Sequence, residues 1–190
     1  AELILTHHPI LFHARKNLRE DDPEGALLCA LIRSGRSLIA AHTNFDQAEG
    51  GVNDVLARAL GLQNIVPLDE GLRVGDFPGE NLTDAVARGL DASPWVYGEA
   101  RGAFRRVAVC GGAGGSLWEI AHAAGAQAYV TGEAKYADAL LCAAAGTTLI
   151  LAGHDKTERL CVKAMRNGLQ KRLDAIQYNV RVFESAARSY

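Results

Sequence analysis

The sequence predicts an α/β protein with largely parallel sheets. Short runs rich in valine, isoleucine and leucine alternate with amphipathic helical segments, an order typical of parallel strands joined by helical crossovers. Four of the apolar runs end in polar or glycine-rich clusters, and ligands bind at the carboxyl ends of strands in such folds. At 190 residues, of which 48% are hydrophobic and 22% charged, the chain is long enough to bury a core.

The first third of the chain is expected to form two strands and two helices. Residues 2–6 and 37–41 have the apolar composition of short strands. Pro23 opens a helix in which leucines recur at helical spacing. Gly61 ends an amphipathic helix that begins near residue 52.

The rest of the chain begins with an irregular region over residues 62–104, which contains a helix capped by Asn81 and a strand near residues 95–97. Beyond it, the expected strands are residues 105–110, 126–132, 147–153 and Ile176–Phe183, and the expected helices are residues 116–125, 134–146 and 157–173. We interpret residues 67–149 as a second lobe inserted into a first lobe made of residues 1–66 and 150–190.

Charge and cysteine content argue against several classes of partner. The formal net charge of −2 disfavours nucleic acid and membrane surfaces, because both require a basic field on the protein. The four cysteines form no C-x-x-C pair, so neither a disulfide framework nor a zinc knuckle is expected, and the cytoplasm is the expected location. No apolar run is long enough to cross a bilayer.

Histidines and a glutamate with metal-ligand spacing follow two of the apolar runs. His7 and His8 end the first run, and their rings can converge because Pro9 turns the chain away from the strand. His154 and Glu158 stand four residues apart, which places both on one face of a helix. The alternatives are a solvated histidine pair and a capping histidine beside an exposed glutamate. We favour metal ligands because the other strand ends offer partner ligands and the two pairs complement each other.

Two further clusters carry weaker indications. Asp46 is a plausible terminal metal ligand and His42 a group near the substrate, although an Asx turn with a surface histidine explains the same spacing. The glycine loop, Gly111–Gly115, joins a strand to a helix, so its N–H groups can bind a phosphate or simply form a tight turn. Glu133 follows another apolar run and is indicated less strongly than the others.

The sequence resembles one known family across nearly its whole length. The motifs T-H-H-P, A-H-T-N-F-D, E-G-G-V-N-D, V-C-G-G-A-G-G-S, T-G-E-x-K-Y and A-G-H-x-x-T-E occur in the order found in the GTP cyclohydrolase I type 2 homologue family. The resemblance implies a toroidal homohexamer of two interlocked α/β lobes. The family carries a further strand and helix ahead of H-H-P, so we expect this chain to lack an N-terminal portion.

The resemblance also implies a dinuclear metal centre with two divalent ions per subunit, which we expect to be zinc, iron or manganese. Matched by motif, His7 and His8 would bind different ions. Asp46 would join His8 on one ion, and His154 would join His7 on the other. Glu158 would bridge the two ions, and the first lobe would be the metal-binding lobe.

Two functions fit these residues. The first is a metal-dependent hydrolase acting on a small molecule, with Glu158 and His42 as catalytic residues and two ions ~3.5–4 Å apart. The second is a non-enzymatic metal-binding or regulatory ring protein. A nucleotide binder without metal rests on the glycine loop alone and leaves the histidines unexplained.

Overall fold

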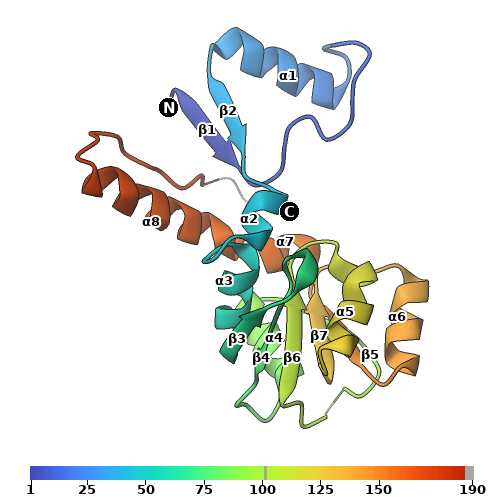
Figure 1. The fold of residues 1–190 in the computed structure, drawn as a ribbon. Coiled ribbons are helices and arrows are strands. Elements are labelled where there is room, and N and C mark those ends of the chain that lie inside the picture. The colour runs from blue at the N-terminus through green and yellow to red at the C-terminus, as the bar shows by residue number, and fades with distance from the viewer. Residues whose placement is uncertain (101, 187–190) are drawn as a thin grey trace. The chain divides into compact units, whose positions relative to one another are not determined.

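The computed structural model describes residues 1–100 and 102–186 and has the predicted α/β fold (Figure 1). By internal contacts the chain forms two compact units, residues 1–45 and the part of the chain from residue 46 onward. Each unit has its own sheet. No helix in the described ranges is long and apolar enough to span a membrane.

The first unit is a strand–helix–strand motif. Strand β1 (Leu3–Thr6) pairs in parallel with β2 (Ser37–Ala40), in a register that places Thr6 opposite Ala40. Helix α1 (Pro23–Ser34) connects them; its amino terminus is capped by the Asp22 carboxylate, which accepts a hydrogen bond from the Glu24 N–H at 3.2 Å. Both strands therefore point their carboxyl ends to one edge.

The second unit is built on a six-stranded sheet with strands in the order β3-β4-β6-β7-β8-β5. Its parallel centre is formed by three strands, β6 (Arg106–Cys110), β7 (Ala128–Thr131) and β8 (Thr148–Leu151). The flanking strands run antiparallel to their neighbours: β3 (Gln63–Pro67), β4 (Arg73–Asp76) and β5 (Trp95–Tyr97). In this sheet β3, most of which belongs to the predicted first lobe, pairs with β4 of the predicted second lobe.

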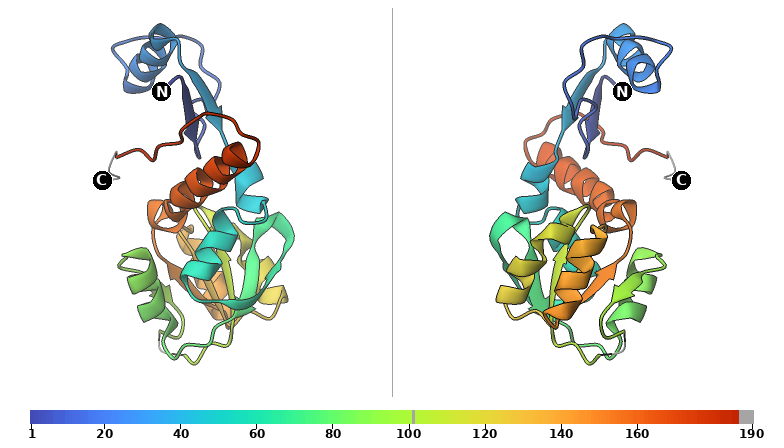
Figure 2. Two further views of the ribbon diagram at one scale, coloured as in Figure 1. Left: turned by 90° about the vertical axis from the view of Figure 1, so that its left-hand side faces the viewer. Right: turned by 90° about the vertical axis from the view of Figure 1, so that its right-hand side faces the viewer.

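Helices cover both faces of this sheet (Figures 1 and 2). Alternate residues of β6 face opposite sides, so Val107 and Val109 join one core cluster while Ala108 joins the other. On the first side lie α3 (Val52–Ala59) and α4 (Leu82–Leu90); on the second lie α5 (Trp118–Ala123) and α6 (Tyr136–Ala144). A strand buried on both faces is apolar throughout, which is why the central strands were predicted.

The carboxyl-terminal region departs from the prediction in two ways. The helix predicted at residues 157–173 begins earlier and is split into α7 (His154–Glu158) and α8 (Leu160–Ala175). Residues 176–183 are not a strand. They turn back along α8, where the Gln170 side chain donates to the carbonyl of Val180 at 3.1 Å and accepts from the Val182 N–H at 2.8 Å (Figures 1 and 2).

Three short helices complete the described fold and connect these elements. They are α2 (Thr43–Gln47) and two 3₁₀ turns, η1 (Asp69–Gly71) and η2 (Gly114–Leu117). The turn η2 opens α5 directly after the glycine loop, so the candidate residues around it lie at the carboxyl edge of the parallel strands.

Candidate metal centre

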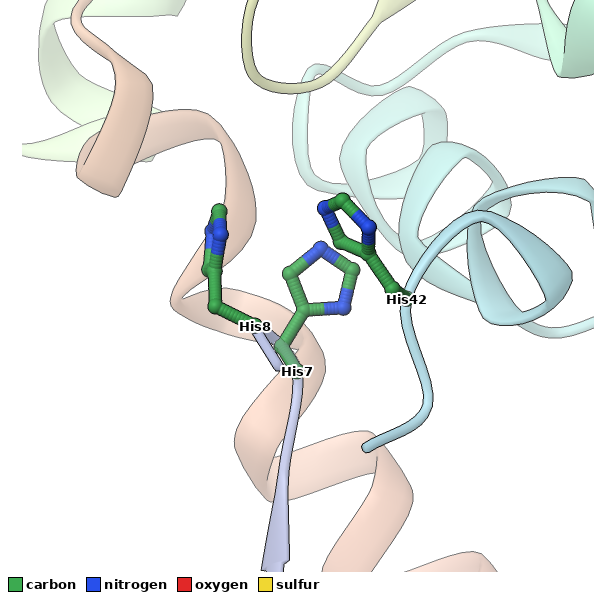
Figure 3. Close-up of side chains that lie close together, drawn as sticks. All are labelled: His7, His8 and His42. Atoms are coloured by element: carbon green, nitrogen blue, oxygen red, sulfur yellow. The ribbon is translucent and has the colours of Figure 1, made fainter. Parts of the chain in front are cut away.

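Three imidazoles gather at the carboxyl edge of the first unit. His7 and His8 follow β1, and His42 follows β2, so the parallel register brings them to the same place. The ring centroids are 4.9 Å apart for His7 and His8, 5.1 Å for His7 and His42, and 5.0 Å for His8 and His42 (Figure 3). One nitrogen from each ring lies within 4.8 Å of the others, which is close enough for a shared metal ion.

A backbone hydrogen bond determines which ring nitrogen of His7 carries the proton. Its Nδ1 lies 2.8 Å from the carbonyl oxygen of Ala41, and a carbonyl oxygen can only accept, so Nδ1 carries the proton. In a neutral imidazole this leaves Nε2 with the lone pair that a metal ion needs. The Thr6 hydroxyl donates to the carbonyl of His8 at 2.8 Å and tightens the turn between strand and histidines.

In the second unit, His154 lies between two carboxylates. Its Nε2 is 3.2 Å from Oε1 of Glu158, one helical turn away on α7, and its Nδ1 is 3.2 Å from Oε1 of Glu133. The Glu158 side chain is only 11% exposed, whereas Glu133 is 59% exposed. A histidine whose far nitrogen donates to a carboxylate is the usual arrangement of a metal-binding imidazole, and it gives Glu133 a supporting position.

The glycine loop does not have the free N–H groups that an anion seat requires. Four of its five N–H groups are donated within the protein, to acceptors 2.7–3.2 Å away: Gly111 to Asn53 Oδ1, Gly112 to Thr157 Oγ1, Gly114 to Thr131 Oγ1 and Gly115 to the Glu133 carbonyl. Of the two alternatives that the sequence left open, these hydrogen bonds favour the tight strand-to-helix turn over the phosphate site.

The loop has glycine at residue 112 because a side chain there would enter the candidate site. Gly112 has φ +64°, a left-handed conformation, and a Cβ atom built on it would overlap Oε1 of Glu158 and lie 3.2 Å from Nε2 of His154. Since Thr157 Oγ1 accepts from Gly112 and donates to the His154 carbonyl at 2.8 Å, the loop and α7 are held together. The glycine loop therefore leaves room for the side chains of His154 and Glu158 and is fixed to the helix that carries them.

A buried asparagine ties Asp46 to the same loop. Asn53, which is 1% exposed, donates to the carbonyl of Asp46 at 3.2 Å and accepts from Gly111 at 2.7 Å. Arg73 stabilises the chain just after Asp46 by donating to the carbonyls of Gln47 at 3.0 Å and Ala48 at 3.2 Å. The sequence analysis quoted Asn53 within a motif but gave neither it nor Arg73 a role.

Arg73 is held in turn by a buried ion pair with Asp54. Burial of Asp54 opposes its ionisation, but the Gly50 N–H and the guanidinium of Arg73 outweigh it and lower the pKa of the carboxyl below its ordinary value. Asp54 therefore stays charged and keeps Arg73 in place near neutral pH.

The pKa values of two buried thiols are raised in part by the negative charge of the candidate ligands. Burial, together with the charges of Asp46 and Glu158, raises the pKa of Cys110 to about 11. The same three causes, with the charge of Glu158 ahead of that of Asp46, raise the pKa of Cys161 to about 12. Both carboxylates thus act on the same region of the second unit, and the thiols stay protonated and unsuited to bind metal.

The donor chemistry fits divalent transition metals. The first unit offers three imidazoles, and the second offers the imidazole of His154 with the carboxylates of Asp46 and Glu158. Mixed imidazole and carboxylate donors suit zinc, iron and manganese.

Comparison with known proteins identifies the family. A model of the Duf34/NIF3 (NGG1p interacting factor 3) family matches residues 1–189. The chain belongs to this family. Duf34/NIF3 relatives named GTP cyclohydrolase 1 type 2 homolog include one from Nostoc sp., 35% identical over 172 residues, and one from Lactococcus lactis, 33% identical over 144 residues. These alignments cover 84% and 70% of this chain and 65% and 56% of the relatives, so the chain spans less than two thirds of either.

Solved structures of Duf34/NIF3-like proteins have the same fold. A Bacillus cereus protein related to NIF3 superposes with a TM-score of 0.94 at 21% identity, covering 100% of this chain and 82% of that one. Reduced HcgD from Methanocaldococcus jannaschii superposes with a TM-score of 0.75 at 28% identity, covering 91% and 71%. These structures confirm the α/β fold, and the family model confirms the family resemblance.

Proposed function

We propose that this Duf34/NIF3 protein holds two divalent metal ions and uses them to hydrolyse a small-molecule substrate. The observation that carries the proposal is the gathering of three imidazoles at the carboxyl ends of β1 and β2, with ligand nitrogens within 4.8 Å of one another. Imidazole is a common metal ligand, and the Nδ1 contact of His7 leaves the lone pair on its Nε2.

We assign the ligands by the family motifs. His7 and His154 bind one ion, His8 and Asp46 bind the other, and Glu158 bridges both. The geometry of the second unit supports this assignment: His154 and Glu158 are one turn apart on α7, and Asn53 anchors the backbone of Asp46.

Held by the five ligands assigned above, the metal ions would lower the pKa of a water molecule and polarise the bond to be cleaved. Glu133 orients His154 through Nδ1, and Gly112 leaves the space into which the Glu158 carboxylate fits. The ring of His42 lies 5.1 Å from that of His7 and 5.0 Å from that of His8, and an imidazole in this place can move a proton to or from the substrate.

The names of the relatives suggest where to begin the search for a substrate. GTP cyclohydrolase 1 type 2 homolog implies hydrolysis of a carbon–nitrogen bond in a heterocycle, and we propose this reaction class for the present chain. We also propose that the protein assembles as a homohexamer in the cytoplasm. The four free cysteines fit such a reducing setting.

Elemental analysis of anaerobically purified protein tests the metal centre. We expect two ions per chain, and a lower content in His8→Ala than in His13→Ala, a matched change of an exposed histidine outside the ligand set. Folded protein without bound metal would refute the proposal.

Activity tests the hydrolase assignment separately. Metal-loaded protein is assayed against a panel of nucleotides, phosphoesters and amides, and Glu158→Gln is expected to abolish the activity found. Activity that survives this change contradicts the two-metal form of the mechanism. Metal binding without turnover on any substrate would favour a regulatory ring protein instead.

A further inference from the structure

An exposed tryptophan lies at the ligand edge of the six-stranded sheet. Strand β5 runs antiparallel to β8, with Trp95 opposite Leu151, so the first residue of β5 lies beside the last residue of β8. The carboxyl end of β8 leads through Gly153 to His154. An edge strand in the opposite direction thus brings an aromatic side chain from the irregular middle of the chain to the candidate site.

Trp95 is one wall of a pocket of about 440 Å³, which we call the Trp95 pocket. Its indole is 72% exposed, whereas the next two residues of β5, Val96 and Tyr97, pack against the two core clusters. A large aromatic side chain left in water costs hydrophobic free energy, and the pocket volume is within the roughly 300–1,000 Å³ of small-molecule sites.

The rest of the Trp95 pocket is suited to a flat ligand that donates hydrogen bonds. Gly132 and Gly153 line it with backbone alone, and Glu133 contributes the only charged group of its lining. Glu133 Oε1 contacts His154, and within residues 1–100 and 102–186 its Oε2 makes no hydrogen bond. That oxygen is an acceptor, and a wall with an acid and no base disfavours a phosphate.

We propose that the Trp95 pocket binds an amino-substituted heteroaromatic ring, which stacks on the indole of Trp95 and donates an N–H group to Glu133 Oε2. Trp95 is then a specificity-determining residue, and Glu133 both supports His154 and recognises the amino group of the ring. This inference rests on the proposed function in taking the ring to be part of the substrate. Ring binding itself requires no metal ion.

Intrinsic fluorescence of chelator-treated protein provides the first test, because the chain has only two tryptophans. In Trp118→Phe, where Trp95 is the sole tryptophan, adenosine is expected to quench the emission to saturation, and ribose to have no effect. Equilibrium dialysis then compares Trp95 variants. Trp95→Ala should weaken adenosine binding roughly tenfold, the usual loss for a stacked base, and Trp95→Phe should retain most of the affinity.

The role of Glu133 is tested with purine riboside, which is adenosine without the amino group. It should bind more weakly than adenosine to the unmodified protein, and Glu133→Gln should reduce this difference. No saturable binding of adenosine up to millimolar concentration, or equal binding by Trp95→Ala and the unmodified protein, would overturn the proposal.

Metal content, measured on anaerobically purified protein before chelator treatment, separates this inference from the proposed function. Ring binding without metal binding leaves the Trp95 pocket standing and removes the hydrolase mechanism. Metal binding without ring binding does the reverse.

Discussion

Replacement of Asn53 by alanine should destabilise the protein far more than the same replacement of an exposed asparagine. The buried amide makes three hydrogen bonds with main-chain groups: to the carbonyls of Asp46 at 3.2 Å and Gly71 at 2.9 Å, and from the Gly111 N–H at 2.7 Å. At ~0.5–1.5 kcal/mol each, their loss costs roughly 1.5–4.5 kcal/mol. The Gly71 carbonyl keeps a second donor in Arg73, but the Gly111 N–H does not, so we expect about 3 kcal/mol.

The assay is thermal unfolding followed by circular dichroism. For a chain of this length, about 3 kcal/mol corresponds to a Tm lower by roughly 6–12 °C. The matched control is Asn81→Ala, which removes the one hydrogen bond of a helix cap and should cost about 1 kcal/mol, or roughly 2–4 °C. Equal Tm values for the two variants would show that Asn53 does not act as a buried clamp.

Three further predictions concern Gly112, Asp54 and the cysteines. Gly112→Ala should reduce metal content sharply because its methyl group meets the Glu158 carboxylate, whereas Gly35→Ala, at φ +63° with open space, should only lower Tm slightly. Because the folded pKa of Asp54 is lowered, its charge stabilises the protein above pH ~4 and this stability is lost on further acidification; Asp54→Asn should flatten that part of the pH–stability curve. At pH 8, a thiol reagent should modify Cys29 first and leave Cys110 unmodified until unfolding, which absorbance at the reagent's wavelength reports.

The predicted strands are confirmed where the chain is buried on both faces, as in β6, β7 and β8. The sequence analysis missed β3 and β4 because their residues do not alternate in a simple way. Asn64 in β3 has φ +49°, and β4 contains Arg73, a charged residue that is 4% exposed because of its partner Asp54. From sequence alone, a charged residue is expected at the surface, and only its ion-pair partner explains its burial. Conversely, residues 176–183 have strand-like composition but follow α8 instead of a sheet.

The sequence by itself determined the α/β class, the family resemblance and the candidate ligands, because these depend on neighbouring residues. The pairs His7–His8 and His154–Glu158 are close through local geometry alone. Only the tertiary structure decided what surrounds them. The partners that occupy the glycine loop lie 58 residues away at Asn53 and 45 residues away at Thr157. Trp95 reaches the ligand edge only because β5 adds to the sheet in the antiparallel direction. Hydrogen bonds and strand direction at such separations arise from the packing of the whole sheet, which no local pattern encodes.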